Sequence, residues 1–146
     1  EEYCGIIWVS AMINENKCVL KLEHLVFDEL HFQRKGFPNE NEVTFSLGFN
    51  VETREDRELI VHISLKGSKE NEYDILVAAT GYFALDEESP YERLALRQNA
   101  VAIIFPYIRA QMSLLTAQPE MPPIVIPPMN VAQMVEDAEK AKGSDS

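Results

Sequence analysis

Residues 43–52 have the sequence VTFSLGFNVE, and this stretch decides the fold class. Its apolar side chains occupy every second position: Val43, Phe45, Leu47, Phe49 and Val51. Successive side chains of a β-strand point to opposite faces, so an apolar period of two predicts a strand with one buried face.

The same alternation recurs on both sides of this stretch. Residues 59–65 and residues 73–85 repeat it downstream, and residues 19–33 carry apolar side chains upstream. The upstream run breaks its phase at Leu25 and Phe27, which indicates a β-bulge or a bend. The chain therefore contains four expected strands.

The segments between these strands are short and turn-like. Residues 35–39, 54–57 and 67–71 are rich in glycine, proline, asparagine and charged side chains. Short connections favour antiparallel pairing of consecutive strands. The sequence therefore predicts a four-stranded antiparallel meander.

After Pro90 the apolar period becomes that of a long helix. One row of side chains at helical spacing suits packing on the sheet: Val101, Phe105, Ile108, Met112 and Leu115. A second row lies elsewhere on the same helix: Leu96, Ile103, Tyr107 and Leu114. One small sheet cannot cover both rows, so we expect the second row to form an oligomer interface. Pro106 predicts either a kink or two helices that meet there.

A proline-rich extended segment follows from Pro119 to Pro128. Asn130 is a suitable N-cap for a short second helix, with Gln133 reaching back to it. The expected organisation is an N-terminal segment of uncertain structure at 1–17, one domain at 18–139 and a polar tail at 140–146.

The charge balance excludes one class of partner. The chain has 13 basic and 24 acidic residues, a formal net charge of −11 at pH 7. Phosphate binding needs a basic surface, so we expect no nucleic acid partner. The longest apolar run, residues 3–13, is too short to cross a membrane, and Glu1 and Glu2 precede it where a signal peptide has basic residues. We expect no membrane insertion.

Motifs for catalysis or metal binding are absent from the sequence. Cys4 and Cys18 are too few for a disulfide scaffold and suit a reducing, cytoplasmic compartment. The histidines, at positions 24, 31 and 62, have no metal-ligand spacing. The sequence has no nucleophile elbow, phosphate-binding glycine loop or dinucleotide fingerprint. We therefore expect no cofactor, no metal and no enzymatic activity.

Residues 121–130, with the sequence MPPIVIPPMN, allow two interpretations. As a strap, the segment crosses the sheet and its isoleucines belong to the core. As a groove wall, it borders a channel for extended apolar polypeptides. Methionines around it suit a surface that accepts many partners, although they also fill gaps in ordinary cores.

Three elements, taken in order, resemble a known family. Gly81-Tyr82-Phe83 ends the last expected strand, Phe105-Pro106-Tyr107-Ile108-Arg109 lies in the long helix, and Pro128-Met129-Asn130 begins the second helix. Over residues 19–139 this combination resembles the SecB family of chaperones. The resemblance implies an α+β fold: a four-stranded antiparallel sheet followed by a long helix, a Pro-rich crossover loop and a short second helix.

The resemblance also implies a function. SecB proteins are homotetramers that hold unfolded or precursor polypeptides in apolar grooves without ATP. By position, the client groove of this chain would draw on the following residues: Tyr82, Phe83, Met112, Leu115, Met121, Ile124, Ile126 and Met129.

The chain departs from the export members of that family at the surface that docks the SecA motor. Glu29 matches an acidic position there, whereas Gln33 and Leu76 stand where acids are expected. SecA binding is therefore one alternative. The other is the role of SecB-like chaperones that protect an antitoxin in a toxin–antitoxin module.

Two further classes remain open on the sequence alone. The chain could be a structural or adaptor subunit whose loop is only a strap. It could also bind a small ligand in the same pocket.

Overall fold

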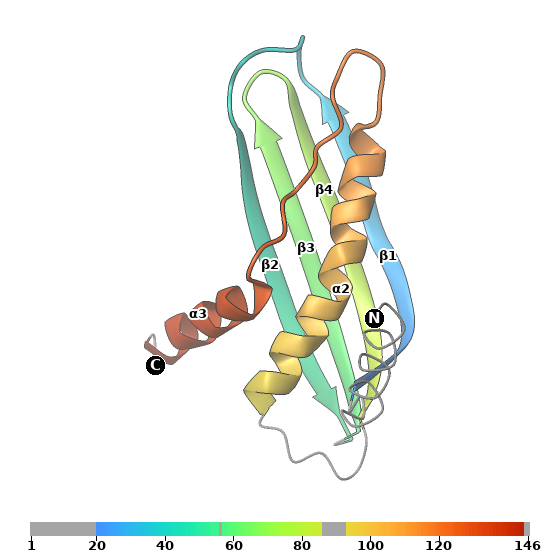
Figure 1. Ribbon diagram of the computed structural model, residues 1–146, viewed down its shortest axis with the longest axis vertical. Helices are drawn as coiled ribbons and strands as arrows, with labels where there is room; N and C mark the ends of the chain where they lie inside the picture. The colour runs from blue at the N-terminus through green and yellow to red at the C-terminus, as the bar shows by residue number, and fades with distance from the viewer. Residues whose placement is uncertain (1–19, 56, 86–92, 145–146) are drawn as a thin grey trace, which may run out of the picture.

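The computed structural model describes residues 20–55, 57–85 and 93–144, which form one antiparallel sheet and two helices (Figure 1). The strands are β1 (Leu20–Arg34), β2 (Val43–Arg54), β3 (Glu58–Lys69) and β4 (Tyr73–Leu85), and the helices are α2 (Arg93–Thr116) and α3 (Val131–Ser144). This architecture confirms the predicted α+β fold. Expectations for residues 1–17 lie outside the described residues.

The strand order in the sheet is β1-β4-β3-β2, so the meander prediction is wrong for the first strand. Strands β2, β3 and β4 do follow one another as antiparallel neighbours. Strand β1 instead pairs with β4 along its whole length, from Leu20 opposite Leu85 to Arg34 opposite Tyr73. Three strand spacings of ~4.8 Å separate β1 from β2, a distance that residues 35–42 can span at ~3.3 Å per residue.

Hydrogen bonds hold this crossing connection to the turn between β3 and β4. The backbone N–H groups of Lys35 and Gly36 donate to the carbonyl oxygen of Glu72, at 2.7 and 3.2 Å. The buried carboxylate of Glu72 accepts from the backbone N–H of Asn39 at 2.7 Å and pairs with Lys69 at 2.7 Å. Long-range contacts, not the length of the connection, therefore decide where β1 pairs.

The predicted irregularity in the first strand is confirmed. The register of β1 against β4 shifts between Leu22 and His24 and again between Phe27 and Glu29. These shifts match the breaks in apolar phase seen in the sequence, because an extra residue reverses the face of each later side chain.

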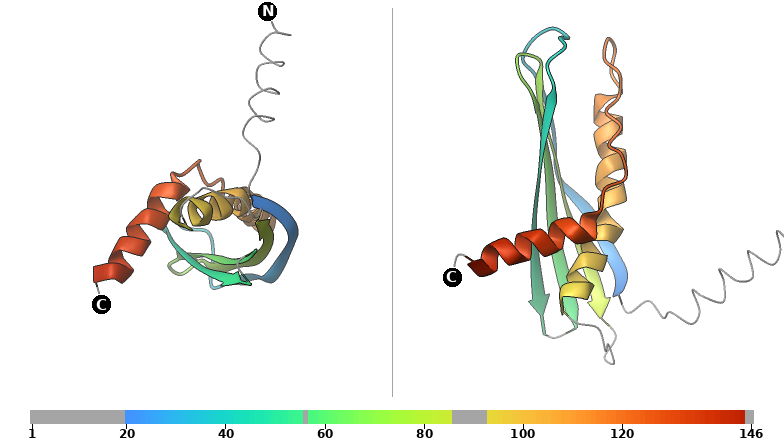
Figure 2. Two further views of the ribbon diagram at one scale, coloured as in Figure 1. Left: turned by 90° about the horizontal axis from the view of Figure 1, so that it is seen from below. Right: turned by 60° about the vertical axis from the view of Figure 1, so that its left-hand side comes forward.

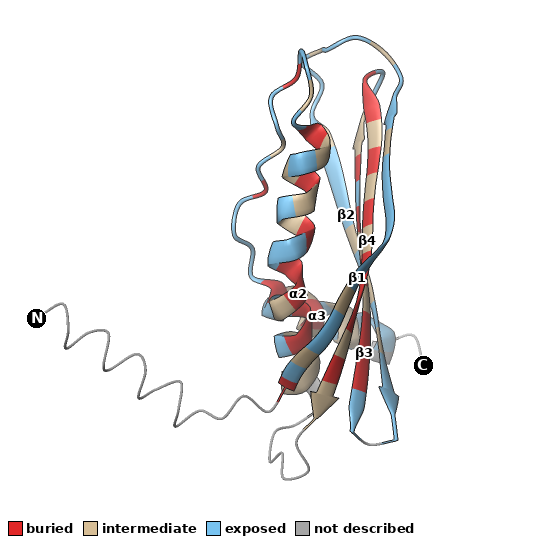
Figure 3. Cartoon of the chain, turned by 90° about the vertical axis from the view of Figure 1, so that its right-hand side faces the viewer, coloured by how far each residue is buried: buried red, intermediate tan, exposed pale blue. Residues whose placement is uncertain are grey.

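One face of the sheet packs against α2, and the core lies between them (Figure 3). Alternate residues of β3 and β4 and the first apolar row of α2 form this core, and its fully buried members include Val61, Ile63, Val77, Val101, Ile104 and Ile108. Helix α2 packs on β1, β3 and β4, so the apolar residues of β2 are only half-buried or exposed. Pro106 is exposed within α2 and does not divide it into two helices.

The crossover loop, residues 117–130, runs back along α2 and leads into α3, which extends away past the β2 edge (Figure 2). Asn130 is the N-cap, as predicted, since the backbone N–H of Gln133 donates to Oδ1 of Asn130 at 3.1 Å. The prediction that Gln133 reaches back to Asn130 is wrong for its side chain, because Nε2 of Gln133 donates to Oδ1 of Asp137 at 2.9 Å. Arg97 and Glu139 join the helices through a 2.6 Å ion pair. Helix α3 continues to Ser144, so residues 140–144 of the expected polar tail are helical.

No described helix covers the other face of the sheet, which we call the outer face (Figure 2). Within the described residues, neither helix combines the length and the apolarity that crossing a lipid bilayer requires.

Candidate functional site

The crossover loop is fixed to α2 by hydrogen bonds to both backbone groups of one residue. The N–H of Ile124 donates to Oγ1 of Thr116 at 2.7 Å. The hydroxyl of Ser113 donates to the carbonyl oxygen of Ile124, also at 2.7 Å. Loop side chains face in opposite directions around this point: Met121 and Ile126 are buried, whereas Val125 is 80% exposed. The loop therefore serves as a strap over the core and also presents apolar surface outward.

A hollow of about 300 Å³ lies where the end of the crossover loop meets both helices. Apolar side chains form most of its walls, and one basic residue, Arg109, contributes to it. The lining residues are Ala102, Phe105, Pro106, Arg109, Pro128, Met129, Asn130, Val131 and Ala132. We call this the loop hollow.

Arg109 has an unusual environment in the loop hollow. Its Nε atom is buried and has no hydrogen-bond partner. The guanidinium lies 5.9 Å from the centre of the Phe105 ring, a cation–π contact within the same helix. The loop hollow thus combines apolar walls with an unpaired hydrogen-bond donor.

The structure separates the predicted groove residues into three groups. Met129 is 44% exposed and lines the loop hollow. Leu115, at the end of α2, and Ile124, in the crossover loop, are half-buried, whereas Met121 and Ile126 of the same loop are buried. The others lie away from the loop hollow: Phe83, Met112 and Tyr82.

Phe83 and Met112 are fully buried in the core and offer no surface to a partner. Tyr82 points to the outer face, where its ring contacts His24 at a centroid distance of 6.4 Å. Adjacent strand residues face opposite sides of a sheet, so Tyr82 and Phe83 cannot line one groove.

The second apolar row of α2 is turned away from the sheet. Tyr107 is 49% exposed and Leu114 is 67% exposed, while Leu96 and Ile103 are half-buried. On the β1 side of α2, opposite to the crossover loop, Phe27 and Leu30 of β1 are also exposed. The second register shift lies between these two residues, which is why Phe27 and Leu30, an odd and an even position, face the same side of the sheet.

The outer face carries a hydrogen-bonded chain across three strands. The hydroxyl of Thr80 in β4 donates to Oδ2 of Asp28 in β1 at 2.5 Å, and Nδ1 of His62 in β3 lies 2.8 Å from the same hydroxyl oxygen. Asp28 sits in the second bulge of β1, which turns its carboxylate toward Thr80. Glu29, next to it, is exposed.

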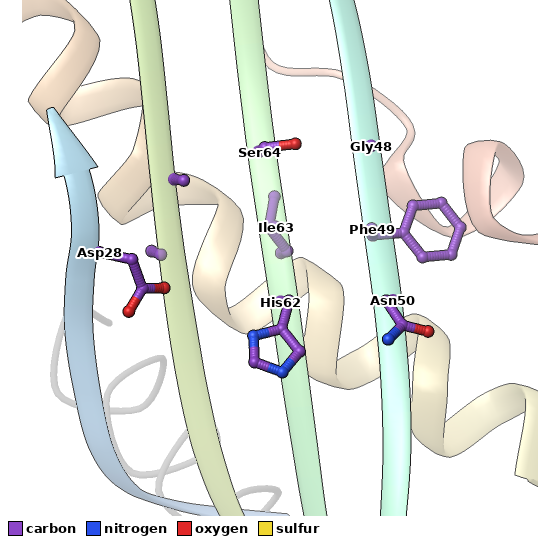
Figure 4. Close-up of a pocket in the computed structure, with 9 residues that line it drawn as sticks. Asp28, Gly48, Phe49, Asn50, His62, Ile63 and Ser64 are labelled. Atoms are coloured by element: carbon purple, nitrogen blue, oxygen red, sulfur yellow. The ribbon is translucent and has the colours of Figure 1, made fainter. Parts of the chain in front are cut away.

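A second hollow of about 300 Å³ lies on the outer face beside this chain (Figure 4). Asp28 and His62 border it, with Asn50 and Ser64, and it exists partly because Gly48 and Ala78 have little or no side chain there. Among the described residues, no group of three or more His, Cys, Asp or Glu side chains could hold a metal ion.

Arg109 lines the loop hollow but was not among the predicted groove residues, although it belongs to the Phe105–Arg109 motif. A signal was present: the helix positions three and four residues away are Phe105, Pro106, Met112 and Ser113, none of them acidic. A cation inside an apolar helical row without an acidic neighbour at these spacings indicates a partner from elsewhere.

Comparisons with known proteins agree with this architecture. No family model matches the chain. The chain is 30% identical over 138 residues to uncharacterized protein MJ0357 of Methanocaldococcus jannaschii, an alignment that covers 86% of this chain and 88% of that protein.

Among solved structures, the chain is similar to the Mycobacterium tuberculosis Rv1957 SecB-like chaperone in complex with a ChAD peptide from the Rv1956 HigA1 antitoxin. The TM-score is 0.58 at 16% identity, over 84% of this chain and 97% of that chain. A protein of unknown function from Streptococcus agalactiae matches with a TM-score of 0.43 at 13% identity, over 74% of this chain and 96% of that chain. The first likeness shows that the fold is SecB-like.

Proposed function

The chain belongs to the same family as the Methanocaldococcus jannaschii protein, and from that premise and its SecB-like fold we propose that it is an ATP-independent chaperone. It holds unfolded or precursor polypeptides through extended apolar segments. The loop hollow is the part of the subunit to which these segments bind.

The shape of the loop hollow is the observation that carries this proposal. Three elements form it, and its walls are mostly apolar, with Phe105, Pro106, Met129 and Val131 among them. A concave, preformed apolar site of this kind suits a side chain of an extended polypeptide. Met129 is flexible and polarizable, so the site can accept side chains of different shapes.

Assembly is part of the proposed function. Tyr107 and Leu114 on α2, with Phe27 and Leu30 on β1, leave apolar surface exposed on one side of the subunit. We propose that this surface, with Leu96 and Ile103, pairs with further copies in a homotetramer. Assembly would place several loop hollows in one particle, so that a long client could contact more than one.

The client role most in keeping with the outer face is protection of an antitoxin or a similar unfolded segment. The fold likeness to a chaperone bound to an antitoxin peptide supports this role. Export through SecA is the alternative: Glu29 on β1 matches an acidic position expected for it, whereas Gln33 and Leu76 carry no charge. In both roles the protein would act in the cytoplasm.

Suppression of aggregation tests the proposal directly. Equimolar protein, without nucleotide, should prevent the light scattering of a heat-aggregating model enzyme. Met129→Asp should weaken this protection several-fold, because a carboxylate inside an apolar hollow is costly to desolvate. Phe37→Asp is the matched control: Phe37 is 89% exposed in the β1–β2 connection, outside the loop hollow.

Equal loss of protection in both variants would assign the effect to general surface hydrophobicity. No protection by the unaltered protein would favour the structural or adaptor role instead. Displacement of a small dye from the loop hollow, without any suppression of aggregation, would favour a small-ligand site.

A further inference from the structure

We infer that the loop hollow recognises an acidic side chain of its client, flanked by apolar residues, through the guanidinium of Arg109. This inference rests on the proposed function and adds a chemical selectivity to it. It assigns Arg109 as the residue that decides which apolar segments bind best.

The unpaired Nε–H group of Arg109 is the first support. This atom is buried, yet none of the described residues accepts its hydrogen bond. Buried donors in native proteins almost always have a partner, because an unpaired one loses its hydration without compensation. Because this atom has no accessible surface, an acceptor from the client reaches it, and removes this deficit, when the Arg109 side chain turns toward the bound client.

The second support is the absence of a free acid near Arg109 in the described part of the chain. The acidic side chains of α3 are engaged elsewhere: Glu136 with Lys140 at 3.1 Å, Asp137 with Gln133 at 2.9 Å, and Glu139 with Arg97 at 2.6 Å. The guanidinium of Arg109 lies 5.9 Å from the centre of the Phe105 ring, and none of the ion pairs given for the described residues involves it. Its charge is therefore available to an incoming anion.

Geometry favours a carboxylate over other acceptors. The Nε–H and one Nη–H of a guanidinium form a planar fork that matches the two oxygens of a carboxylate. The first turn of α3 also borders the loop hollow at Val131 and Ala132, and the positive end of its helix dipole adds to the attraction. Apolar walls around the fork would strengthen the pair by excluding water.

The overall charge makes this site selective. A net charge of −11 repels acidic polypeptides in general. A client carboxylate is attracted only where it reaches Arg109 and is repelled elsewhere. A segment with one acid among apolar residues should therefore bind to the loop hollow, whereas a strongly acidic segment should not. Such a site would choose among clients that have similar hydrophobicity.

The proposed oligomer interface leaves the loop hollow open. The α2 wall of the hollow contains Ala102, Pro106 and Arg109, and the outward row contains Ile103, Tyr107 and Leu114. Ile103 directly follows Ala102, and Tyr107 directly follows Pro106. Successive residues of an α-helix are rotated by about 100°, so the outward row lies about 100° around α2 from the wall of the loop hollow. A client could therefore enter beside the interface.

Two acetylated, amidated nonapeptides test the inference by isothermal titration calorimetry. Both consist of leucine, isoleucine and serine around a central residue, which is aspartate in one and asparagine in the other. We expect the aspartate peptide to bind about tenfold more tightly to the unaltered protein, a free-energy difference of about 1.4 kcal/mol. Arg109→Gln should abolish this preference, so that the two peptides bind with equal affinity.

Two variants control for charge and for geometry. Lys66→Gln removes one positive charge from an exposed position on the outer face and should preserve the preference. Arg109→Lys keeps the charge but loses the planar fork, and should reduce the preference to about threefold or less. If Arg109→Gln does not fold, the Nε–H resonance of Arg109 in the unaltered protein should still shift with the aspartate peptide and not with the asparagine peptide.

The failures of the two proposals are distinguishable. Equal binding of both peptides to the unaltered protein, or a preference that survives in Arg109→Gln, overturns the carboxylate site and leaves the chaperone proposal standing. Failure of both peptides to bind, together with no suppression of aggregation, overturns the proposed function and with it this inference.

Discussion

Thr116 and Ile124 are joined by a 2.7 Å hydrogen bond in which the backbone N–H of the crossover loop donates to a buried hydroxyl of α2. Thr116→Val keeps the shape of the side chain and leaves that N–H unpaired, so we expect a loss of about 1–3 kcal/mol in the free energy of unfolding. Urea denaturation measures this loss. Ser113→Ala should cost less, because the carbonyl oxygen of Ile124 is part-exposed and water can replace the lost donor. A larger effect of Ser113→Ala would mean that the loop is held mainly through its carbonyl group.

Glu72 predicts a stability change in mild acid. Its hydrogen bond with Lys69, with a further one from the N–H of Asn39, holds the pKa of the Glu72 carboxyl below its ordinary value, although burial opposes this. A lowered folded-state pKa contributes stability that is fully present above the ordinary glutamate pKa of about 4.3 and is lost as the pH falls through the folded value. Between about pH 5 and pH 3, the unaltered protein should therefore lose more unfolding free energy than Glu72→Gln. Parallel pH curves for the two proteins would show that this carboxylate does not contribute.

Gly36 should not tolerate a side chain. A Cβ atom there would lie 2.2 Å from the backbone carbonyl oxygen of Asn71, and a backbone atom cannot move aside cheaply. We expect Gly36→Ala to destabilise the protein by about 1–3 kcal/mol, as forced overpacking does. Gly48→Ala is the matched control, since its Cβ would meet only the Ser64 side chain, at 3.2 Å. Equal thermal midpoints for the two variants would contradict the tight approach at Gly36.

Leu114 should control assembly without affecting the fold of the subunit. It is 67% exposed, so Leu114→Asp disturbs little in an isolated subunit but would place a charge inside an apolar interface. Light scattering should show a tetramer for the unaltered protein and smaller species for Leu114→Asp. Val125→Asp, on the exposed side of the crossover loop, should leave the assembly intact. A stable monomer of the unaltered protein at micromolar concentration would refute the interface.

The outer face predicts weak binding to SecA. Glu29 is exposed there, but Gln33 and Leu76 bring no charge, and Asp74 is engaged by Lys35 at 3.0 Å. Each screened surface pair contributes about 1 kcal/mol or less, so Glu29, the one acid at the three expected positions, supports only a modest complex. Calorimetric titration with SecA should show binding weaker than about 10 μM, and Glu29→Gln should change it little. Sub-micromolar binding would favour the export role.

The apolar periodicities of the sequence were sufficient to predict the strands and helices of this fold. Alternation at Leu59, Val61 and Ile63 predicted a strand facing the core, and the row through Phe105 and Ile108 predicted the buried side of α2; both are confirmed. The pairing of β1 with β4 was not predictable in this way. It depends on the contacts of Lys35, Gly36 and Asn39 with Glu72, which join positions more than thirty residues apart.

The residues of the candidate site were harder to predict than the elements of the fold, because the core and the exposed hollow are lined by the same types of apolar residue. Phe83, Met112 and Met129 all have large apolar side chains, so the sequence does not distinguish them. In the structure the first two are fully buried, and of the three Met129 alone lines the loop hollow. Arg109 was visible as a cation without an acid at helical spacing. Its unpaired Nε atom, however, depends on how closely the loop and α3 approach α2.

The position of β1 in the sheet has a consequence for the synthesis of the protein. Strands β2, β3 and β4 can pair by successive hairpins as the chain emerges from the ribosome, whereas β1 is made first and its partner last. At a translation rate of ~5–20 residues per second, β4 is completed roughly 3–10 s after β1. During that interval β1 presents Phe27, Leu30 and unpaired backbone groups to solvent. The proposed chaperone is thus itself, during synthesis, a polypeptide of the kind that it is proposed to bind.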